Sequence, residues 1–168
     1  GIYYFKDGAS VLREIEYLLD NDIREKGEYQ LTNVLDSLKN QGCKFVPGKV
    51  EEWWDCGNKN ATINTNQRVL ATISDEVLVS DQITNEGSEI IEPCFIGKEV
   101  KLVNAKVGPY VSIGDGSIIE NSTIENTIIY SHAHIQNASI KNSMIGNHVE
   151  YNGSAKELSL SDYSTQKD

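Results

Sequence analysis

Aliphatic residues recur at a short, regular interval through the second half of this 168-residue chain. An amphipathic helix repeats every 3.6 residues and a half-buried strand every two, so neither produces an interval of five or six. A repeat close to six is typical of β-helix coils with three flat faces. We therefore predict a β-helix over residues 90–152, with the repeating residue pointing inward. The series is Ile90, Ile96, Leu102, Val107, Ile113, Ile119, Ile124, Ile129, Ile135, Ile140 and Ile145.

The positions beside the aliphatic series suit the corners of such coils. Glycine follows the repeat residue at Gly97, Gly108, Gly114 and Gly146. Asparagine also recurs, and both residue types tolerate the positive φ angles of tight turns. At about 18 residues per coil, the region predicts three coils or slightly more. The asparagines expected to occupy corners and stack along the axis are Asn104, Asn121, Asn126, Asn137, Asn142 and Asn147.

Residues 1–71 carry a different pattern, in which helix and strand signals alternate. Apolar residues at helical spacing follow Ser10, a candidate N-cap, and recur after Gly27 and after Asn58. This is an α/β segment, and it is too short to form a complete doubly wound domain. The runs that predict strands are Ile2–Phe5, Cys43–Val46 and Val50–Trp54.

The two remaining segments carry neither pattern. Residues 72–89 are polar and acidic, with one apolar patch at Val77–Val79, and we interpret them as a linker. Residues 153–168 are polar, and we expect a solvated tail there. The predicted order is an α/β segment, a linker, a β-helix and a tail.

Charge and apolar content exclude several classes of partner. The net charge is −10, which argues against nucleic acid polymers and anionic membrane surfaces, because both require a surplus of Lys and Arg. The uninterrupted apolar runs are far shorter than the roughly 18–20 residues needed to span a bilayer. The three cysteines form no Cys-x-x-Cys motif. These features predict a reduced, cytoplasmic protein.

One concentrated group of chemically active side chains lies in residues 51–57, which read Glu-Glu-Trp-Trp-Asp-Cys-Gly. A carboxylate at the end of a strand, before a glycine turn into a helix, is well placed for a divalent metal and phosphate oxygens. The alternative is structural. In that case Asp55 caps the helix that starts near Asn58, and the two tryptophans belong to the core.

Several stretches together resemble the carboxy-terminal half of the sugar-1-phosphate nucleotidyltransferases. They are Gly1–Phe5, Lys26–Thr32 and Trp54–Gly57, followed by the hexapeptide repeats. The chain looks most like the glucose-1-phosphate thymidylyltransferase group, whose relatives carry an appended left-handed parallel β-helix. The resemblance implies an incomplete nucleotidyltransferase α/β domain over residues 1–71, followed by that β-helix.

The resemblance also implies roles for individual residues. Asp55 corresponds to one of two family aspartates that hold Mg²⁺ against the nucleotide phosphates. The Gly-Glu-Tyr stretch borders the sugar-phosphate pocket, which implicates Glu28, Tyr3 and Lys26 in substrate binding. The chain departs from the family pattern with Asn33 in place of Asp. It departs again at residue 56, where Cys replaces the commoner Thr.

Part of the family's site is absent from these residues. The family binds nucleotide through a glycine-rich loop that carries Arg, followed by a Lys and a first metal-binding Asp, and residues 1–71 contain no such loop. Without it the donors and cations that stabilise phosphoryl charge are missing. We therefore expect no complete catalytic set and no activity from this chain alone. Its single methionine is Met144, which also fits an enzyme seen without its amino-terminal half.

In the complete enzyme, the implied reaction is in-line attack of a sugar-1-phosphate oxygen on the α-phosphate of a nucleoside triphosphate. Pyrophosphate leaves. The implied cofactor is Mg²⁺, and the implied ligands are the sugar-1-phosphate and the nucleoside triphosphate.

Two other functions remain open at this point. Many hexapeptide-repeat proteins are acyltransferases that use a histidine as general base toward an acyl-CoA. His132 and His134 would point the same way from an extended segment, and this His-x-His spacing could also indicate a metal site. His148 lies one coil further on. The bland interpretation is exposed histidines without a chemical role.

The third possibility is a non-enzymatic assembly module. Ile91, Ile118 and Ile128 stand beside the inward series and would point outward. Apolar side chains on the outer faces, together with exposed strand edges, predict a homo-oligomer formed through the β-helix.

Overall fold

The computed structural model describes residues 2–153 and 157–167 and divides into two compact units, residues 1–51 and 52–168. The first unit contains two helices, α1 (Gly8–Asp20) and α2 (Leu31–Asn40). Among the described residues, no helix has both the length and the apolar character required to cross a lipid bilayer.

The two helices of the first unit pack through a small apolar cluster. Leu18 of α1 meets Val34 and Leu38 of α2, and all three side chains are buried. A polar contact supports this pairing, because the Glu14 carboxylate accepts hydrogen bonds from Ser37 Oγ at 2.5 Å and from Gln41 Nε2 at 2.6 Å. These hydrogen bonds hold the pKa of Glu14 below its ordinary value.

The N-cap of α1 differs from the sequence prediction. Asp7, rather than Ser10, occupies the cap, and its Oδ1 accepts hydrogen bonds from the backbone N–H groups of Ala9 and Ser10. Ser10 already lies inside the first turn, where its hydroxyl donates to the other Asp7 oxygen. Asp and Ser are comparable N-cap residues, so residue type alone does not distinguish the two positions.

The three predicted strands of the α/β segment are not formed. The stretches Ile2–Phe5, Cys43–Val46 and Val50–Trp54 carry no ladder in the described structure. A strand exists only with a hydrogen-bonded neighbour, and no other described segment pairs with these stretches. The helices of the prediction are confirmed, and α3 (Lys59–Thr72) falls in the second unit rather than the first.

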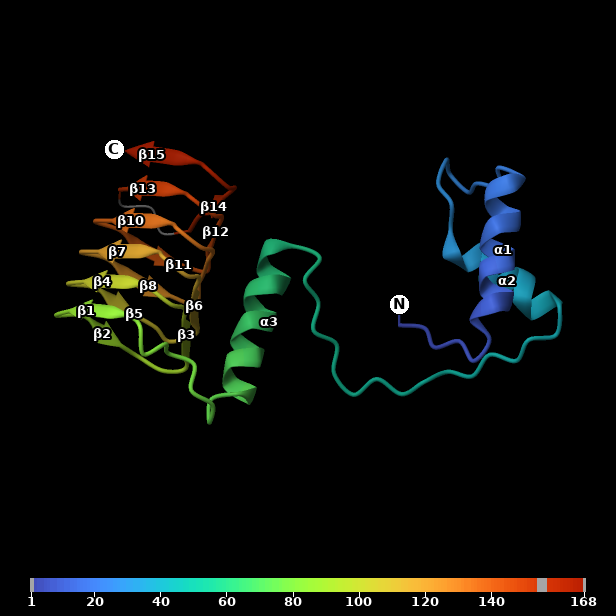
Figure 1. Ribbon diagram of the computed structural model, residues 1–168, viewed down its shortest axis with the longest axis horizontal. Helices are drawn as coiled ribbons and strands as arrows, with labels where there is room; N and C mark the ends of the chain where they lie inside the picture. Colours follow the sequence, from blue (N-terminus) through green and yellow to red (C-terminus); the bar gives the residue numbers. More distant parts are fainter. Residues whose placement is uncertain (1, 154–156, 168) are drawn as a thin grey trace. The chain divides into compact units, whose positions relative to one another are not determined.

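The rest of the second unit is a parallel β-helix, here called the solenoid, whose strands stack along one axis (Figure 1). Its first sheet contains β1 (Thr84–Glu86), β4 (Lys101–Val103), β7 (Ile118–Glu120), β10 (His134–Gln136), β13 (Glu150–Asn152) and β15 (Thr165–Lys167). The second contains β2 (Glu89–Ile90), β5 (Lys106–Val107), β8 (Thr123–Glu125) and β11 (Ser139–Lys141). The third contains β3 (Cys94–Ile96), β6 (Val111–Ile113), β9 (Ile128–Ile129), β12 (Met144–Ile145) and β14 (Ser159–Leu160).

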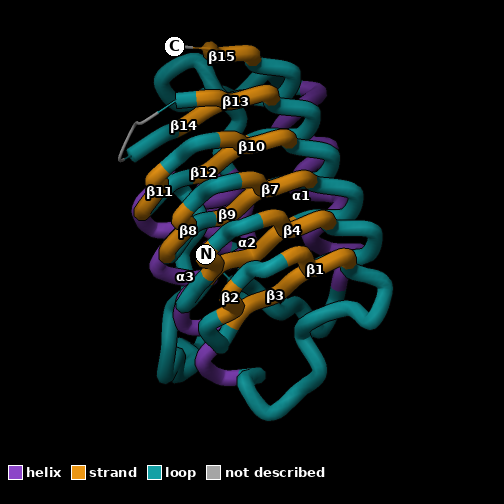
Figure 2. Tube along the Cα trace, turned by 90° about the vertical axis from the view of Figure 1, so that its left-hand side faces the viewer, coloured by secondary structure: helices purple, strands orange, loops and turns teal. Residues whose placement is uncertain are grey.

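Every pairing in these sheets is parallel, and each strand meets the equivalent strand of the next coil (Figure 2). Along the first sheet, Lys101 is in register with Ile118, which is in register with His134. A coil therefore takes 17 or 16 residues here, slightly fewer than the predicted length.

The predicted inward series is confirmed. Its members from Ile96 to Ile145 are at most 2% exposed, and Ile90 is half-buried against the same core. The solenoid is longer than predicted, since β1 comes from the predicted linker and β14 and β15 from the predicted tail. These coils are polar outside, but Ile83, Leu158 and Leu160 pack against the core.

Corners with positive φ join the three faces. Five of the six predicted asparagines have φ between 43° and 52°. Two of them stack directly, because Asn126 Nδ2 donates to Asn142 Oδ1 at 2.8 Å. The sixth, Asn147, instead accepts the backbone N–H of Ser131 in the preceding coil at 3.1 Å.

Candidate functional site

Residues 52–57, here called the Asp55 segment, fold back onto the first turns of α3. The Asp55 carbonyl accepts a hydrogen bond from Thr65 Oγ1 at 2.7 Å, and Thr62 Oγ1 lies 3.3 Å from the Cys56 carbonyl that follows it. The Asp55 side chain does not cap α3. Asn58 takes that position and accepts from the N–H of Ala61 at 3.0 Å, so the structural alternative for Asp55 is wrong.

The Asp55 carboxylate is exposed and only partly engaged. Its Oδ1 accepts the backbone N–H of Gly57 at 3.1 Å, and the described residues offer Oδ2 no hydrogen bond. Gly57 leaves room for this arrangement, because a Cβ there would lie 3.3 and 3.4 Å from the two carboxylate oxygens.

This carboxylate fits the chemistry of a shared Mg²⁺ site. Mg²⁺ usually takes one or two protein carboxylates, while phosphates and water complete its octahedron. Within residues 2–153 and 157–167, no group of three or more His, Cys, Asp or Glu side chains could hold a metal ion. Asp55 can therefore contribute one ligand, and the remaining ligands must come from phosphates, water or other protein groups.

The two neighbouring tryptophans are not core residues. Trp53 is 57% exposed and Trp54 is 40% exposed. The Trp54 indole N–H donates to Glu52 Oε2 at 2.8 Å. Residues 52–57 thus form an exposed aromatic and acidic segment that is attached to α3 by its main chain.

Lys26 and Glu28, two of the predicted substrate-binding residues, share one tight turn in the first unit. Glu25 and Glu28 exchange backbone hydrogen bonds of 2.9 and 3.1 Å, and the turn passes through Lys26 and Gly27 with positive φ. The Glu28 carboxylate accepts from Gln30 Nε2 at 3.2 Å.

A compact polar cluster of Asp22, Arg24 and Tyr29 lies beside this turn and stabilises it. Tyr29 Oη donates to Asp22 Oδ1 at 2.6 Å, and Arg24 Nε donates to the same oxygen at 2.7 Å. The guanidinium also lies over the Tyr29 ring, 4.4 Å from its centroid. The hydrogen bond from Tyr29 and then that from Arg24 lower the pKa of Asp22.

Tyr3, the third predicted substrate-binding residue, precedes α1 and is half exposed. Its ring stacks on Phe5, with the ring centroids 6.2 Å apart. Asn33 lies in the first turn of α2. Tyr3, Lys26 and Glu28 thus belong to the first unit and Asp55 to the second, and their shared role in substrate binding stays a prediction.

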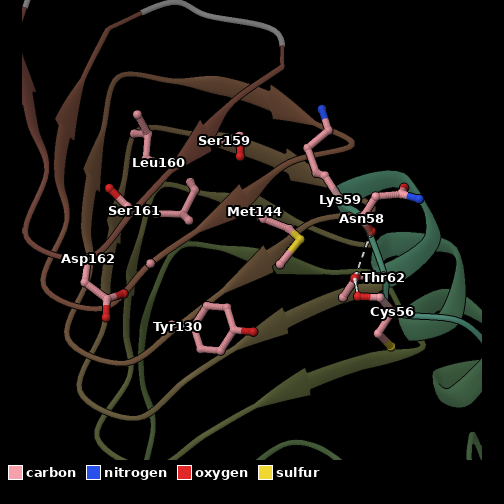
Figure 3. A pocket seen from close by; sticks show the side chains of 12 residues that line it. Cys56, Asn58, Lys59, Thr62, Tyr130, Met144, Ser159, Leu160, Ser161 and Asp162 are labelled. Atoms are coloured by element: carbon pink, nitrogen blue, oxygen red, sulfur yellow. Dashed lines mark hydrogen bonds between the residues drawn. The ribbon is translucent and has the colours of Figure 1, made fainter. Parts of the chain in front are cut away.

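A cavity of about 760 Å³ lies between α3 and the third sheet of the solenoid, where the sequence predicts no site. Figure 3 shows the side chains of the α3 amino terminus facing those of the sheet across it. Tyr130 and Met144 contribute apolar surface, and Asp162 and Lys59 contribute charge. Lys59 Nζ also lies 3.7 Å from Glu157 Oε2. The outward positions of a repeat carry no periodic signal, so the sequence could not reveal this cavity.

The histidines of the solenoid make two different sets of contacts. His132 occupies a corner with φ 58°, and its ring stacks on His148, which in turn stacks on Tyr163. His134 lies on β10, where its Nε2 is 2.9 Å from Glu120 Oε2. The segment from His132 to His134 is therefore not extended, so the condition under which the two histidines would point the same way is not met.

Glu120 is held as a carboxylate by these neighbours. Hydrogen bonds to His134 and to Gln136 lower its pKa. Lys101 on the neighbouring strand adds a weaker attraction in the same direction.

The outward isoleucines are only half-buried. Ile91, Ile118 and Ile128 each keep part of their side chain exposed. Ile128 pairs in register with Met144, so these two apolar side chains adjoin on the third sheet. Their placement leaves apolar surface on the solenoid, as the sequence predicts.

Comparison with known proteins identifies relatives of one kind. No family model matches the chain. The chain is 30% identical over 146 residues to the low-salt glycan biosynthesis nucleotidyltransferase Agl11 of Haloferax volcanii, a match that covers 77% of this chain and 40% of that protein. Two proteins named glucose-1-phosphate thymidylyltransferase are also similar. The one from Streptomyces griseus is 28% identical over 119 residues, or 62% of this chain and 34% of the relative.

The other, from Streptomyces antibioticus, is 26% identical over 144 residues, which cover 77% of this chain and 39% of the relative. The chain thus spans between 34% and 40% of the length of these curated relatives, in their carboxy-terminal part. The resemblance to the carboxy-terminal part of sugar-1-phosphate nucleotidyltransferases is confirmed.

Proposed function

We propose that this chain is the carboxy-terminal part of a sugar-1-phosphate nucleotidyltransferase that joins a nucleoside triphosphate and a sugar-1-phosphate into a nucleotide sugar, with release of pyrophosphate. The main support for this proposal is the similarity of the chain to three nucleotidyltransferases over their carboxy-terminal part. The names of the two Streptomyces relatives favour a thymidylyltransferase acting on glucose-1-phosphate as the finer assignment.

The exposed apolar surface of the first unit supports this proposal. Ile2 is 78% exposed, Tyr4 is 87% exposed and Val46 is 79% exposed, and each lies in an extended stretch without a strand partner. Large apolar side chains in unpaired extended backbone need a sheet and a second layer to cover them. The remainder of a nucleotidyltransferase domain would supply both.

In this proposal Asp55 supplies one carboxylate ligand to Mg²⁺. The bound ion would neutralise charge that develops on the phosphates during in-line displacement. Three residues would contact the sugar-1-phosphate. Glu28 would contact the hydroxyl groups of the sugar, Lys26 would attract its charged phosphate, and Tyr3 would lie beside them. The chain by itself holds no complete catalytic set, and we propose that it is inactive alone.

Asp55 is tested in the protein made from the complete reading frame. Asp55→Asn should reduce kcat by at least about 100-fold, because a neutral amide is a poor Mg²⁺ ligand. Glu51→Gln is the matched control, since Glu51 is an exposed carboxylate four residues away whose contact is an ion pair with Lys49. Equal activity of both variants and the parent would remove Asp55 from the metal site.

The substrate-binding residues are tested by a separation of kinetic constants. Glu28→Gln should raise the KM for the sugar-1-phosphate and leave the KM for the nucleoside triphosphate unchanged. Glu25→Gln is the control from the same turn, because it changes a neighbouring carboxylate and keeps the backbone bridge. A rise in both KM values, or in neither, would contradict this assignment.

We also propose that the solenoid mediates homo-oligomerisation. Within the described residues, β1 and β15 each have a strand neighbour on one side only, and the outer faces carry the half-buried Ile118 and Ile128. Unpaired edges and apolar surface favour contact with a second copy. Light scattering at tens of micromolar protein tests this, and a monomer would refute it.

The three cysteines support a cytoplasmic location. Cys43, Cys56 and Cys94 are free thiols. Cys94 is buried, which raises the pKa of its thiol, and its Sγ donates to the Ile91 carbonyl at 3.0 Å. Unpaired cysteines are typical of reducing compartments.

A further inference from the structure

The hydroxyl groups of α3 do not all make the same contact. Thr62 and Thr72 donate to the carbonyls four residues earlier, of Asn58 and Arg68, both at 2.9 Å. This is the usual contact of a threonine inside a helix. Thr65 departs from it and donates to the carbonyl of Asp55, ten residues earlier, at 2.7 Å.

The next residue, Asn66, connects the same helix to the solenoid. Its Oδ1 accepts a hydrogen bond from Ser112 Oγ on β6 at 2.7 Å, and its Nδ2 donates to the Tyr110 carbonyl at 3.4 Å. Ile63 and Leu70 lie on the same helix face as Asn66, and both are 3% exposed.

Two adjacent residues of α3 therefore hold two different parts of the chain. Thr65 fixes the main chain of Asp55, and Asn66 fixes the helix to the third sheet. The side chains of the Asp55 segment are exposed, and two hydroxyl groups of α3 hold its main chain. Thr65 makes the shorter contact, at 2.7 Å to the Asp55 carbonyl itself, and Thr62 a longer one of 3.3 Å to the Cys56 carbonyl.

We propose that α3 positions the Asp55 carboxylate against the solenoid, with Thr65 and Asn66 as the positioning residues. The solenoid then serves as the rigid platform of the metal-binding segment, in addition to any role in assembly. This inference rests on the proposed function, which makes Asp55 a metal ligand. Partners that orient a metal ligand commonly change metal affinity or activity by 10- to 100-fold when removed.

The tether itself is tested in the chain described above. Its only two tryptophans are Trp53 and Trp54, so its two indole N–H signals report on the Asp55 segment alone. Thr65→Val should lower the order parameters of both indoles and of the Gly57 amide from near 0.85 to below about 0.6. Thr65→Ser should retain the parent values, and Thr72→Val is the matched control with an ordinary hydroxyl contact. Unchanged order in Thr65→Val would overturn the tether.

The functional consequence is tested in the protein made from the complete reading frame. Thr65→Val and Asn66→Ala should each raise the Mg²⁺ concentration for half-maximal rate about 10-fold, with the KM for the sugar-1-phosphate unchanged. Thr65→Ser should restore the parent value. If Asp55→Asn abolishes the rate while Thr65→Val and Asn66→Ala match the parent, the positioning role is wrong and the proposed function stands. If Asp55→Asn leaves the rate and its Mg²⁺ dependence unchanged, Asp55 is not a metal ligand and the positioning role is wrong with it. Absence of pyrophosphate release by the complete protein would instead overturn the proposed function.

Discussion

Ser112 on β6 donates a 2.7 Å hydrogen bond to the side chain of Asn66 in α3, across 46 residues of sequence. Through this contact α3 belongs to the solenoid unit and not to the two helices that precede it, and the division between units falls at residue 51. The sequence grouped α3 with residues 1–71 because its helical signal resembles that of its neighbours. The Asp55 segment is consequently part of the same unit as the β-helix.

The close approach of successive coils predicts that Gly114 tolerates no side chain. A Cβ at this position would lie 2.6 Å from Ser131 N and 2.7 Å from Ser131 Oγ. Gly114→Ala should lower the free energy of unfolding by roughly 1–3 kcal/mol, because the backbones must separate. Urea denaturation followed by circular dichroism measures this. Ser139→Ala, on an exposed position of β11, is the control, and equal midpoints would contradict the contact.

The inward aliphatic series predicts a large cost for creating a cavity. Ile124 is fully buried on β8, whereas Ile128 on β9 is half-buried and points outward. Ile124→Ala should destabilise the solenoid by about 2–5 kcal/mol, and Ile128→Ala by clearly less. The same denaturation measurement compares them, and a reversed order would place the core on the wrong face.

Buried hydroxyl groups at the corners predict a second kind of cost. Ser122 Oγ accepts the backbone N–H of Ala138 in the next coil at 3.0 Å and donates to the Glu120 carbonyl at 2.6 Å. Ser122→Ala leaves that N–H without its partner and should cost about 1–3 kcal/mol. Ser122→Thr, which keeps the hydroxyl, should be less harmful. Loss of stability in Ser122→Thr alone would show that space, not the hydrogen bond, governs this corner.

The Glu120–His134 pair predicts a pH dependence with a definite sign. Hydrogen bonds from His134 and Gln136 lower the pKa of Glu120 from its ordinary value of 4.5 in the folded chain. The stabilisation is therefore present above that value and is lost as the pH falls through the lowered pKa. A partly exposed pair of this kind contributes under about 1 kcal/mol. Glu120→Gln should remove this part of the difference in unfolding free energy between pH 6 and pH 3, and an unchanged difference would contradict it.

The solenoid could be predicted from the sequence because its core is built from one regularly repeated kind of residue. Each face of each coil contributes one inward aliphatic residue, so the spacing of these residues stays visible whatever the outward residues are. Its ends could not be placed in the same way. The strand Thr84–Glu86 is exposed throughout, and its place comes from backbone pairing with β4, which leaves no mark in the pattern of side chains.

The residue types of the candidate site stand out in the sequence, but the hydrogen bonds that hold these residues in place do not. The carboxylate of Asp55 stands out beside a glycine, but its main-chain contact with Thr65 needs the helix to fold back over ten residues. Likewise, the sequence marks Lys26 and Gly27 as a break between helices. The support of that turn by Asp22 and Tyr29 depends on side-chain geometry that no spacing encodes.

Pyrophosphate release distinguishes a complete sugar-1-phosphate nucleotidyltransferase from an inactive carboxy-terminal part of one. The protein made from the complete reading frame and the 168-residue chain are assayed in parallel with Mg²⁺, each nucleoside triphosphate and a panel of sugar-1-phosphates that includes glucose-1-phosphate. We expect turnover by the complete protein, loss of that turnover in Asp55→Asn, and none by the chain alone. Turnover by the chain alone, or none by the complete protein with any sugar-1-phosphate, would contradict it.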